Sequence, residues 1–201
     1  MVDVARKHAL DVSPVDIYRF FCCVSAEGRH RERNRVMACL SFYAGLRASE
    51  IADARWGMVM SANELVGDVL RLEIESAKNL TGRAIPLKAE VREALTEYLS
   101  QLSPAPSRND YILRSERGNR MKPQSVINWF RGVYAKLGLS GASSHSGRRH
   151  FVTMTALRVR EAGGSLRDIQ ELAGHSALST TQLYITRSDD AQVKVKVVDL
   201  I

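Results

Sequence analysis

The sequence predicts an α+β fold that is mainly α-helical and contains one small antiparallel β-sheet. Apolar residues recur at helical spacing along most of the 201 residues, whereas only the stretch 68–87 changes to a spacing of two. The chain contains no internal repeat and no linker long enough to separate two large units. A helical pattern interrupted once by a strand pattern favours a single, mainly helical domain.

Most of the chain is predicted to be helical. The first helix is expected to begin at Pro14, because Ser13 can cap it and proline is favoured at the first helical position. Gly45 is the expected C-terminal cap of the second helix, since glycine readily adopts the left-handed conformation. The other helical segments are expected at residues 30–44, 49–54, 88–102, 123–137, 145–161, 165–173 and 179–185.

The predicted sheet is a hairpin. Residues 68–75 alternate apolar and polar side chains, which is typical of a half-buried strand. A turn at residues 79–82 and a short apolar run at residues 83–87 complete an antiparallel pair, and Pro86 suits the end or edge of a sheet. Lys78 is therefore expected near the tip of the hairpin.

Basic residues are concentrated in the second half of the chain. Residues 1–100 carry 14 basic and 14 acidic side chains, and residues 101–201 carry 15 basic and 8 acidic ones. This excess indicates a polyanionic partner, either a nucleic acid or an anionic membrane. Within residues 108–149 arginine outnumbers lysine seven to two, and arginine favours bidentate phosphate contacts, so nucleic acid is the favoured partner. The candidate DNA contacts, each otherwise a solvated surface charge, are Arg114, Arg117, Arg120, Lys122, Arg131 and Arg149.

Several function classes lack their sequence signature. The chain has no phosphate-binding glycine loop, no dinucleotide fingerprint, no His-Glu-x-x-His and no acidic cluster suited to a two-metal site. Cys22, Cys23 and Cys39 lack metal-ligand spacing and are expected to be small buried side chains. We therefore expect no metal and no other cofactor. Phosphodiester chemistry would then depend on cationic side chains and a protein nucleophile or water.

The expected location is the cytoplasm, with no membrane association. No apolar run is long enough to cross a bilayer, and the first residues contain no apolar signal core. A DNA-binding protein there would associate with the nucleoid.

A small set of reactive residues stands in distinctive surroundings. Taken singly, each has an ordinary structural explanation: Arg47 can pair with Glu50 on the surface, Lys78 can be a turn lysine, and Tyr184 can be a core tyrosine. His145 and Arg148 are three residues apart and share one face of a helix start. The candidate catalytic residues are Arg47, Lys78, His145, Arg148, His175 and Tyr184, with Glu50 as a supporting residue.

The order of the segments around these residues is more specific than any one of them. The chain contains GLRASEI at 45–51, SAKNLTGRAIPL at 76–87, HSGRRHFVT at 145–153 and LAGHSALSTTQLY at 172–184. These segments resemble, in order, the signature boxes and the lysine hairpin of the tyrosine recombinases, the phage-integrase family. The resemblance extends over roughly residues 13–190 and implies the tyrosine recombinase catalytic-domain fold.

The resemblance implies a DNA breaking and joining reaction. Tyr184 would attack the scissile phosphate, giving a 3′-phosphotyrosyl bond and a free 5′-hydroxyl. Arg47 and Arg148 would clamp the non-bridging oxygens, a task that suits the planar and permanently charged guanidinium group. Positioning and electrostatics would carry the reaction without metal or ATP.

The other roles that the resemblance implies concern proton transfer and orientation. Lys78 would protonate the leaving 5′-oxygen as the general acid, and His145 would assist proton transfer at the tyrosine. His175 would donate a hydrogen bond to the phosphate. Glu50 would orient a cation of the active site.

The sequence departs from the family pattern at two positions near the catalytic set. Gly147 stands where the family often has leucine, and Arg149 stands where it often has histidine. Neither is a catalytic position. His150 is expected to be a packing or hydrogen-bonding helix residue.

The expected organisation is a short extension at residues 1–12, a catalytic domain at 13–188 and a tail at 189–201. Many family members carry an additional amino-terminal DNA-clamping domain, which this chain is expected to lack. The apolar tail either packs on its own domain or docks on a neighbouring protomer. The resemblance implies double-stranded DNA as partner, a homotetramer on paired DNA sites, and accessory DNA-bending proteins.

Two alternatives to an active site-specific recombinase remain. One is a recombinase-derived DNA-binding protein that no longer cuts, and the complete catalytic set argues against it. The other is a relaxing enzyme similar to type IB topoisomerases, and the segment 174–184 favours recombinases over that class.

Overall fold

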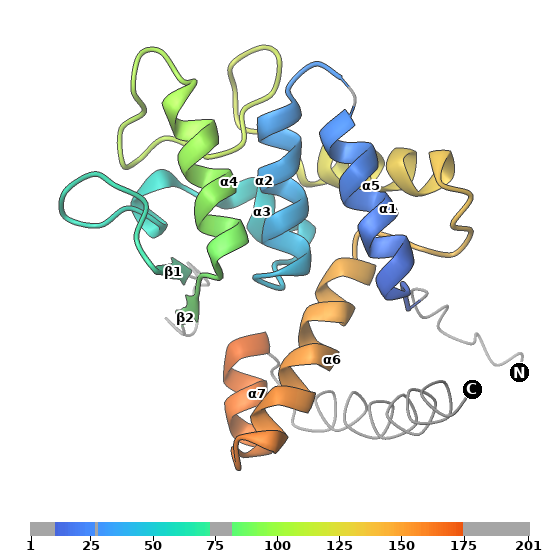
Figure 1. The fold of residues 1–201 in the computed structure, drawn as a ribbon. Helices are drawn as coiled ribbons and strands as arrows, with labels where there is room; N and C mark the ends of the chain where they lie inside the picture. Colours follow the sequence, from blue (N-terminus) through green and yellow to red (C-terminus); the bar gives the residue numbers. More distant parts are fainter. Residues whose placement is uncertain (1–10, 27, 73–81, 175–201) are drawn as a thin grey trace, which may run out of the picture.

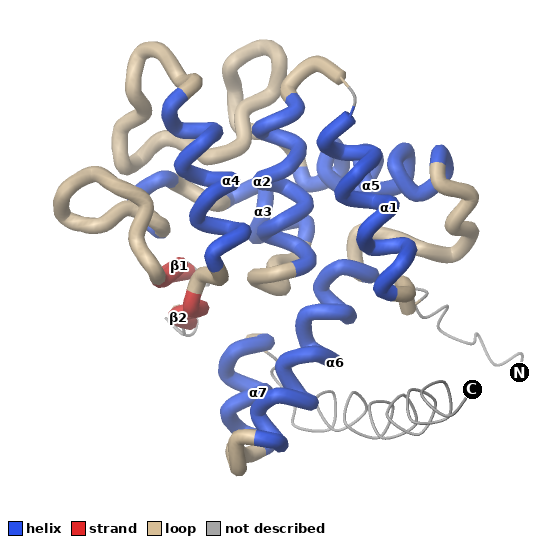
Figure 2. Tube along the Cα trace, viewed as in Figure 1, coloured by secondary structure: helices blue, strands red, loops and turns tan. Residues whose placement is uncertain are grey.

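The computed structural model describes residues 11–26, 28–72 and 82–174, and its fold is the predicted α+β arrangement (Figures 1 and 2). The helices are α1 (Pro14–Ala26), α2 (Arg31–Phe42), α3 (Ala48–Asp53), α4 (Ala89–Ser100), α5 (Pro123–Lys136), α6 (Ser146–Glu161) and α7 (Leu166–Ala173), with a short 3₁₀ turn, η1 (Trp56–Met58). Strands β1 (Val69–Leu72) and β2 (Arg83–Pro86) form an antiparallel pair in which Leu70 lies opposite Ile85. This confirms the predicted fold class.

The first helix begins where the sequence predicts. The Ser13 hydroxyl accepts a hydrogen bond from the backbone N–H of Asp16 at 3.1 Å, and Pro14 is the first helical residue. A serine cap satisfies one of the N–H groups that a helix start leaves without a partner.

The predicted end of the second helix was wrong by two residues. Helix α2 ends at Phe42, and Tyr43 rather than Gly45 occupies the C-cap. Gly45 instead takes a left-handed φ of +67° in the turn that leads to α3. Glycine adopts this conformation without a Cβ penalty.

Helix α2 lies at the centre of the molecule and packs against α1, α4 and α6 (Figure 1). All residues from Val36 to Phe42 are buried, so the helix has no solvent face in its second half. An aromatic cluster joins it to α1 and α5. Its members are Phe20, Phe42, Trp129, Phe130 and Tyr134.

Helices α6 and α7 pack against each other, and α7 also contacts β2 (Figure 1). The N-terminal part of α6 packs on α2, so α6 joins the central helix to the α7 end of the molecule. Strand β2 and the end of α7 both contact the start of α3, where the segment GLRASEI lies: Arg83 bonds to Glu50, and the Gly174 carbonyl accepts from Arg47.

The expectation for the cysteines was wrong in part. Cys39 is buried, and burial raises the pKa of its thiol to about 12, but Cys22 is exposed and Cys23 is half-buried on α1. Helix α1 covers the core with one face only, and Cys22 lies on the other. Within the described ranges, no helix has the length and apolar character needed to span a membrane.

Candidate active site

Arg47 is held at the start of α3 by Glu50. The Glu50 carboxylate accepts one hydrogen bond from the Arg47 backbone N–H at 2.7 Å and another from its Nη1 at 3.0 Å. The second terminal nitrogen of Arg47 donates to the carbonyl of Gly174 at 3.0 Å. The ion pair expected from the sequence is therefore present, and it fixes a guanidinium whose side chain remains 38% exposed.

Arg148 lies in the first turn of α6 and is buried. Its Nη1 donates to the carbonyl of Gly45 at 2.5 Å, and its Nη2 donates to the carbonyl of Ala173. Arg148 thus joins the turn after α2 to the end of α7. Arg47 and Arg148, which are distant in the sequence, meet at consecutive carbonyls of one helix terminus.

His145 lies immediately before α6 and belongs to the same cluster. Desolvation of the ring, together with the positive charges of Arg148, Arg47 and Arg149, lowers the pKa of His145 below its usual value. The side chain is nevertheless exposed. A neutral, accessible imidazole can accept a proton, which is the state that a proton-transfer role at a nucleophile requires.

Two glycines allow α6 to approach the rest of the site. A Cβ on Gly45 would lie 2.2 Å from Cδ1 of Phe151, so the α6 phenyl ring rests directly on the glycine. A Cβ on Gly147 would lie 2.4 Å from the Ser41 hydroxyl of α2. The glycine at 147, which departs from the family pattern, therefore leaves no room for a side chain between α6 and α2.

Sequence reasoning missed Arg83. This arginine opens β2 and donates two hydrogen bonds to Glu50, at 2.8 and 2.9 Å. The only available signal was its position in the hairpin segment, since neither the register of the hairpin nor its contact with α3 is visible in the sequence.

The candidate DNA contacts fall into two groups. Arg117, Lys122 and Arg131 are exposed. Arg114 and Arg120 are exposed as well, but they and Arg149 have acidic partners: Arg114 pairs with Asp110 at 2.8 Å, Arg120 with Asp53, and Arg149 with Asp11 at 3.3 Å. Arg149 is also largely buried, with 11% of its side chain exposed.

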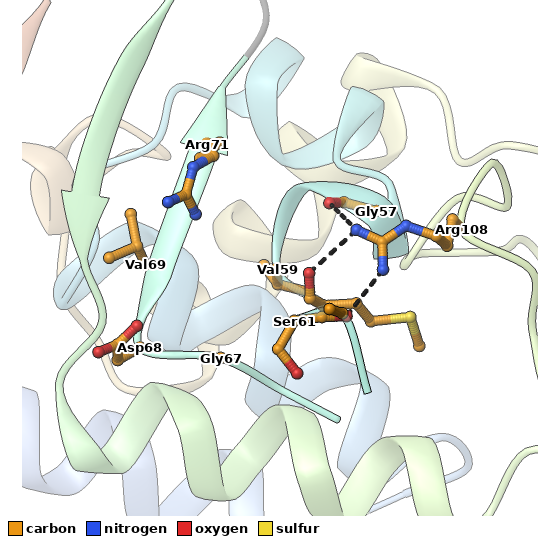
Figure 3. A pocket seen from close by; sticks show the side chains of 10 residues that line it. Gly57, Val59, Ser61, Gly67, Asp68, Val69, Arg71 and Arg108 are labelled. Carbon is orange, nitrogen blue, oxygen red and sulfur yellow. Dashed lines mark hydrogen bonds between the residues drawn. The ribbon is translucent and has the colours of Figure 1, made fainter. Parts of the chain in front are cut away.

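A cavity of about 380 Å³ lies beside η1 and β1 (Figure 3). Arg108 reaches into it and donates to the carbonyls of Gly57, Met60 and Ser61 (Figure 3). These bonds give the guanidinium a structural role, since they satisfy carbonyls at the end of the 3₁₀ turn. None of Arg47, His145 and Arg148 lines this cavity.

Three predicted catalytic residues cannot be placed against this geometry. Lys78, His175 and Tyr184 lie outside the described residues, as does the expected helix at 179–185. His175 directly follows Gly174, whose carbonyl holds Arg47.

Two arginines thus converge at the end of α7 in an α+β domain, within electrostatic reach of His145, and guanidinium groups are suited to anionic ligands such as phosphate. The model of the phage integrase family matches residues 18–191, and the chain belongs to this family.

Among curated proteins, the chain is similar to the tyrosine recombinase XerC of Herpetosiphon aurantiacus, with 30% identity over 174 residues. This match covers 85% of the chain and 53% of that protein. XerC of Rhizobium meliloti is 32% identical over 162 residues, covering 80% of the chain and 47% of that protein. The chain spans about half the length of these relatives.

Solved structures give the same fold. The XerA recombinase is similar with a TM-score of 0.71 and 25% identity, over 96% of the chain and 66% of that structure. The XerH recombinase, in a post-cleavage complex with palindromic difH substrate, is similar with a TM-score of 0.72 and 19% identity, over 96% of the chain and 54% of that structure. These likenesses confirm the tyrosine recombinase catalytic-domain fold.

Proposed function

We propose that the chain is the catalytic part of a site-specific DNA recombinase that cuts and rejoins DNA through a 3′-phosphotyrosyl intermediate. The observation that carries the proposal is the convergence of Arg47 and Arg148 at the end of α7, with His145 beside them. Two guanidinium groups in fixed positions suit two non-bridging oxygens of one phosphodiester. Similarity to the XerC recombinases supports the same activity.

In the proposed reaction, the Tyr184 hydroxyl oxygen bonds to phosphorus while the bond between phosphorus and the 5′-oxygen breaks. The phenolic proton leaves toward His145, whose lowered pKa keeps the imidazole neutral and able to accept it. Lys78 gives a proton to the departing 5′-oxygen. One phosphoester replaces another, so a 5′-hydroxyl of a second strand can reverse the step and join new ends.

The proposed substrate is double-stranded DNA, held beside the active site by exposed cations of residues 108–149. Arg117, Lys122 and Arg131 are the favoured contacts, because they are exposed and form no ion pair with another described residue. Arg114 and Arg120 are also exposed, but they and Arg149 are already paired with carboxylates. Binding by phosphate contacts weakens steeply as salt rises. The XerH neighbour, which was solved with its DNA substrate, is consistent with this partner.

We further propose a catalytic domain at residues 13–188 and a homotetramer on two paired DNA sites, with the tail 189–201 reaching a neighbouring protomer. Such an exchange would couple the active sites, so that only some protomers cut at one time. Accessory DNA-bending proteins would bring the sites together in the cytoplasm, at the nucleoid. Light scattering of the chain with and without duplex DNA tests the assembly, and a mass of one protomer per duplex at saturation would contradict it.

Trapping the covalent intermediate tests the proposed function. The 201-residue chain is incubated in chelator with nicked suicide duplexes made from the DNA junctions that flank its gene, and the products are separated on a denaturing gel. We expect a slow protein–DNA band from the wild type and none from Tyr184→Phe, which lacks only the nucleophilic oxygen. Tyr18→Phe, which alters an exposed tyrosine of α1, is the matched control and should behave as the wild type.

Each outcome of this experiment has a definite meaning. A band that persists in Tyr184→Phe would show that another residue is the nucleophile. DNA binding at low salt without any band from the wild type would favour a DNA-binding protein that does not cut. Absence of both the band and DNA binding would overturn the proposal.

A further inference from the structure

Arg83 is a buried arginine with a two-pronged contact to Glu50. It opens β2, and only 7% of its side chain is exposed. Its Nη1 donates to Glu50 Oε1 at 2.8 Å and its Nη2 to Oε2 at 2.9 Å. This is the parallel fork geometry in which guanidinium and carboxylate groups bind each other most strongly.

Glu50 is shared between two arginines. Its Oε1 also accepts from Nη1 of Arg47 at 3.0 Å, and its Oε2 accepts from the backbone N–H of Arg47 at 2.7 Å. Burial alone would raise the pKa of Glu50, but the hydrogen bonds and charge of Arg83, followed by those of Arg47, outweigh burial and lower the pKa. The carboxylate is therefore ionised, and the group of two arginines and one glutamate carries a net charge of +1.

The two arginines differ in what they face. Arg83 is enclosed, whereas 38% of the Arg47 side chain is exposed. The positive charge that Glu50 does not neutralise is therefore presented to solvent at Arg47. Without Arg83, Glu50 would neutralise Arg47 itself, and an anion approaching Arg47 would meet a neutral ion pair.

Arg83 also supports the backbone that orients Arg47. A Cβ on Gly174 would lie 2.5 Å from Nη1 of Arg83 and 3.0 Å from its Cζ, so the guanidinium packs against this residue. The carbonyl of Gly174 is the acceptor for Nη2 of Arg47 at 3.0 Å. One guanidinium thus contacts both groups that hold Arg47.

We propose that Arg83 is a positioning residue of the phosphate-binding site: it balances the charge of Glu50 and fixes Gly174, so that Arg47 keeps a positive charge for the scissile phosphate. The inference rests on the proposed function, because it assigns Arg47 to a phosphate of DNA. It extends that function to a residue outside the predicted catalytic set, on the second strand of the lysine hairpin.

Inorganic phosphate is a probe that does not require cleavage. The Nε–Hε signal of Arg47 in a ¹⁵N-labelled sample is assigned by its loss in Arg47→Lys and followed during a phosphate titration at constant ionic strength. We expect Arg83→Met to weaken phosphate binding on the order of tenfold, because one nearby unit of positive charge is lost. Arg71→Met removes an exposed arginine from the paired strand β1 and is the matched control, which should change the affinity little.

The double variant separates charge from packing. In Arg83→Met with Glu50→Gln, the positive charge of Arg47 is again uncompensated, so phosphate affinity should recover to within about threefold of the wild type. If Arg83 acted only by packing, the double variant would bind phosphate no better than Arg83→Met. Equal affinities of Arg83→Met and the wild type would also overturn the proposal.

Arg83→Lys keeps the positive charge and provides a second test of the proposal if Arg83→Met does not fold. We expect it to fold and to bind phosphate within about threefold of the wild type, since the charge is retained although the fork is lost. A folded Arg83→Lys that loses affinity on the order of tenfold would contradict charge balancing. Suicide-substrate cleavage by the same variants should follow the phosphate affinities. If the wild type bound phosphate and DNA but did not cleave, the proposed cutting activity would be wrong, and the phosphate titration would still decide the role of Arg83.

Discussion

Arg47 and Arg148 donate hydrogen bonds to the carbonyl oxygens of two consecutive residues, Gly174 and Ala173, at the C-terminal end of α7. The last carbonyls of a helix lack partners within the helix and carry its negative dipole end, so they are natural acceptors for cations. A single helix terminus therefore sets the spacing between both guanidinium groups.

Arg148→Lys and Arg47→Lys should differ in their effect on the free energy of unfolding, although both should reduce DNA cleavage. Arg148 is buried and bridges two carbonyls, so its replacement should lower the free energy of unfolding by about 1–3 kcal/mol, because one ammonium cannot reproduce the fork. Arg47 is 38% exposed, and Arg47→Lys should cost less than about 1 kcal/mol. Both variants should lose most of their cleavage. Urea unfolding and suicide-substrate assays check this, and equal loss of stability in the two variants would contradict it.

Gly45→Ala should damage the contact between the turn after α2 and helix α6. The φ of +67° costs about 1–2 kcal/mol for an L-residue, and the added Cβ would lie 2.2 Å from the Phe151 ring. Overpacking of this kind adds about 1–3 kcal/mol. Chemical denaturation measures the total loss of unfolding free energy in Gly45→Ala, which includes both costs.

Phe151→Ala tests whether the clash between the new Cβ and the Phe151 ring causes the loss of stability in Gly45→Ala. It removes the ring that Gly45→Ala would strike, so the two substitutions together should lose less free energy of unfolding than the sum of the single losses. Additive losses would show that the Cβ does not meet Phe151.

The helices were predictable because their signals are local. The expected 123–137, 145–161 and 165–173 match α5, α6 and α7 to within one residue at each end, since proline, serine and glycine mark several of their ends. The Arg47–Glu50 ion pair was predictable for the same reason: three residues along a helix start lie on one face.

Contacts between distant segments were not predictable. Arg83 meets Glu50 only through the register of the hairpin and the packing of α7 on β2. Arg149 pairs with Asp11, which lies 138 residues earlier in the sequence. Charge counts marked Arg149 as a candidate DNA contact but carry no information about such pairing. Cys22 was misplaced likewise, because composition does not show which face of α1 meets the core.

Gly147→Ala should destabilise the protein although it replaces glycine within a helix. Alanine normally favours a helix by about 0.5–1 kcal/mol over glycine, but here its Cβ would lie 2.4 Å from the Ser41 hydroxyl. We expect a net loss of about 1–3 kcal/mol in thermal or urea unfolding. Leucine at this position, as the family often has, should be worse.

Gly132→Ala is the matched control, since a Cβ there meets nothing within 4 Å in the middle of α5. It should stabilise the protein by about 0.5–1 kcal/mol. Ser41→Gly itself costs stability, because it puts glycine within α2, but together with Gly147→Ala it should lose less than the sum of the two single losses, because it removes the hydroxyl and the Cβ that the new methyl group would strike. If Gly147→Ala gained stability as Gly132→Ala does, α6 and α2 would not approach each other as closely as the structure has them.

The pKa of His145 should rise when Arg149 is replaced by glutamine. Desolvation is the largest cause of the lowered pKa and persists in this variant, but one of the three neighbouring positive charges is removed, so the imidazolium becomes less unfavourable. NMR titration of the histidine ring protons measures the shift. Because the proposed proton acceptor must be neutral, the low-pH limb of the cleavage profile should move to higher pH by the same interval.

Arg158→Gln is the matched control: it removes a charge that lowers the pKa of His150, so it should raise the pKa of His150 and leave the pKa of His145 unchanged. A cleavage profile that stays in place while the His145 pKa moves would show that another group accepts the proton from Tyr184.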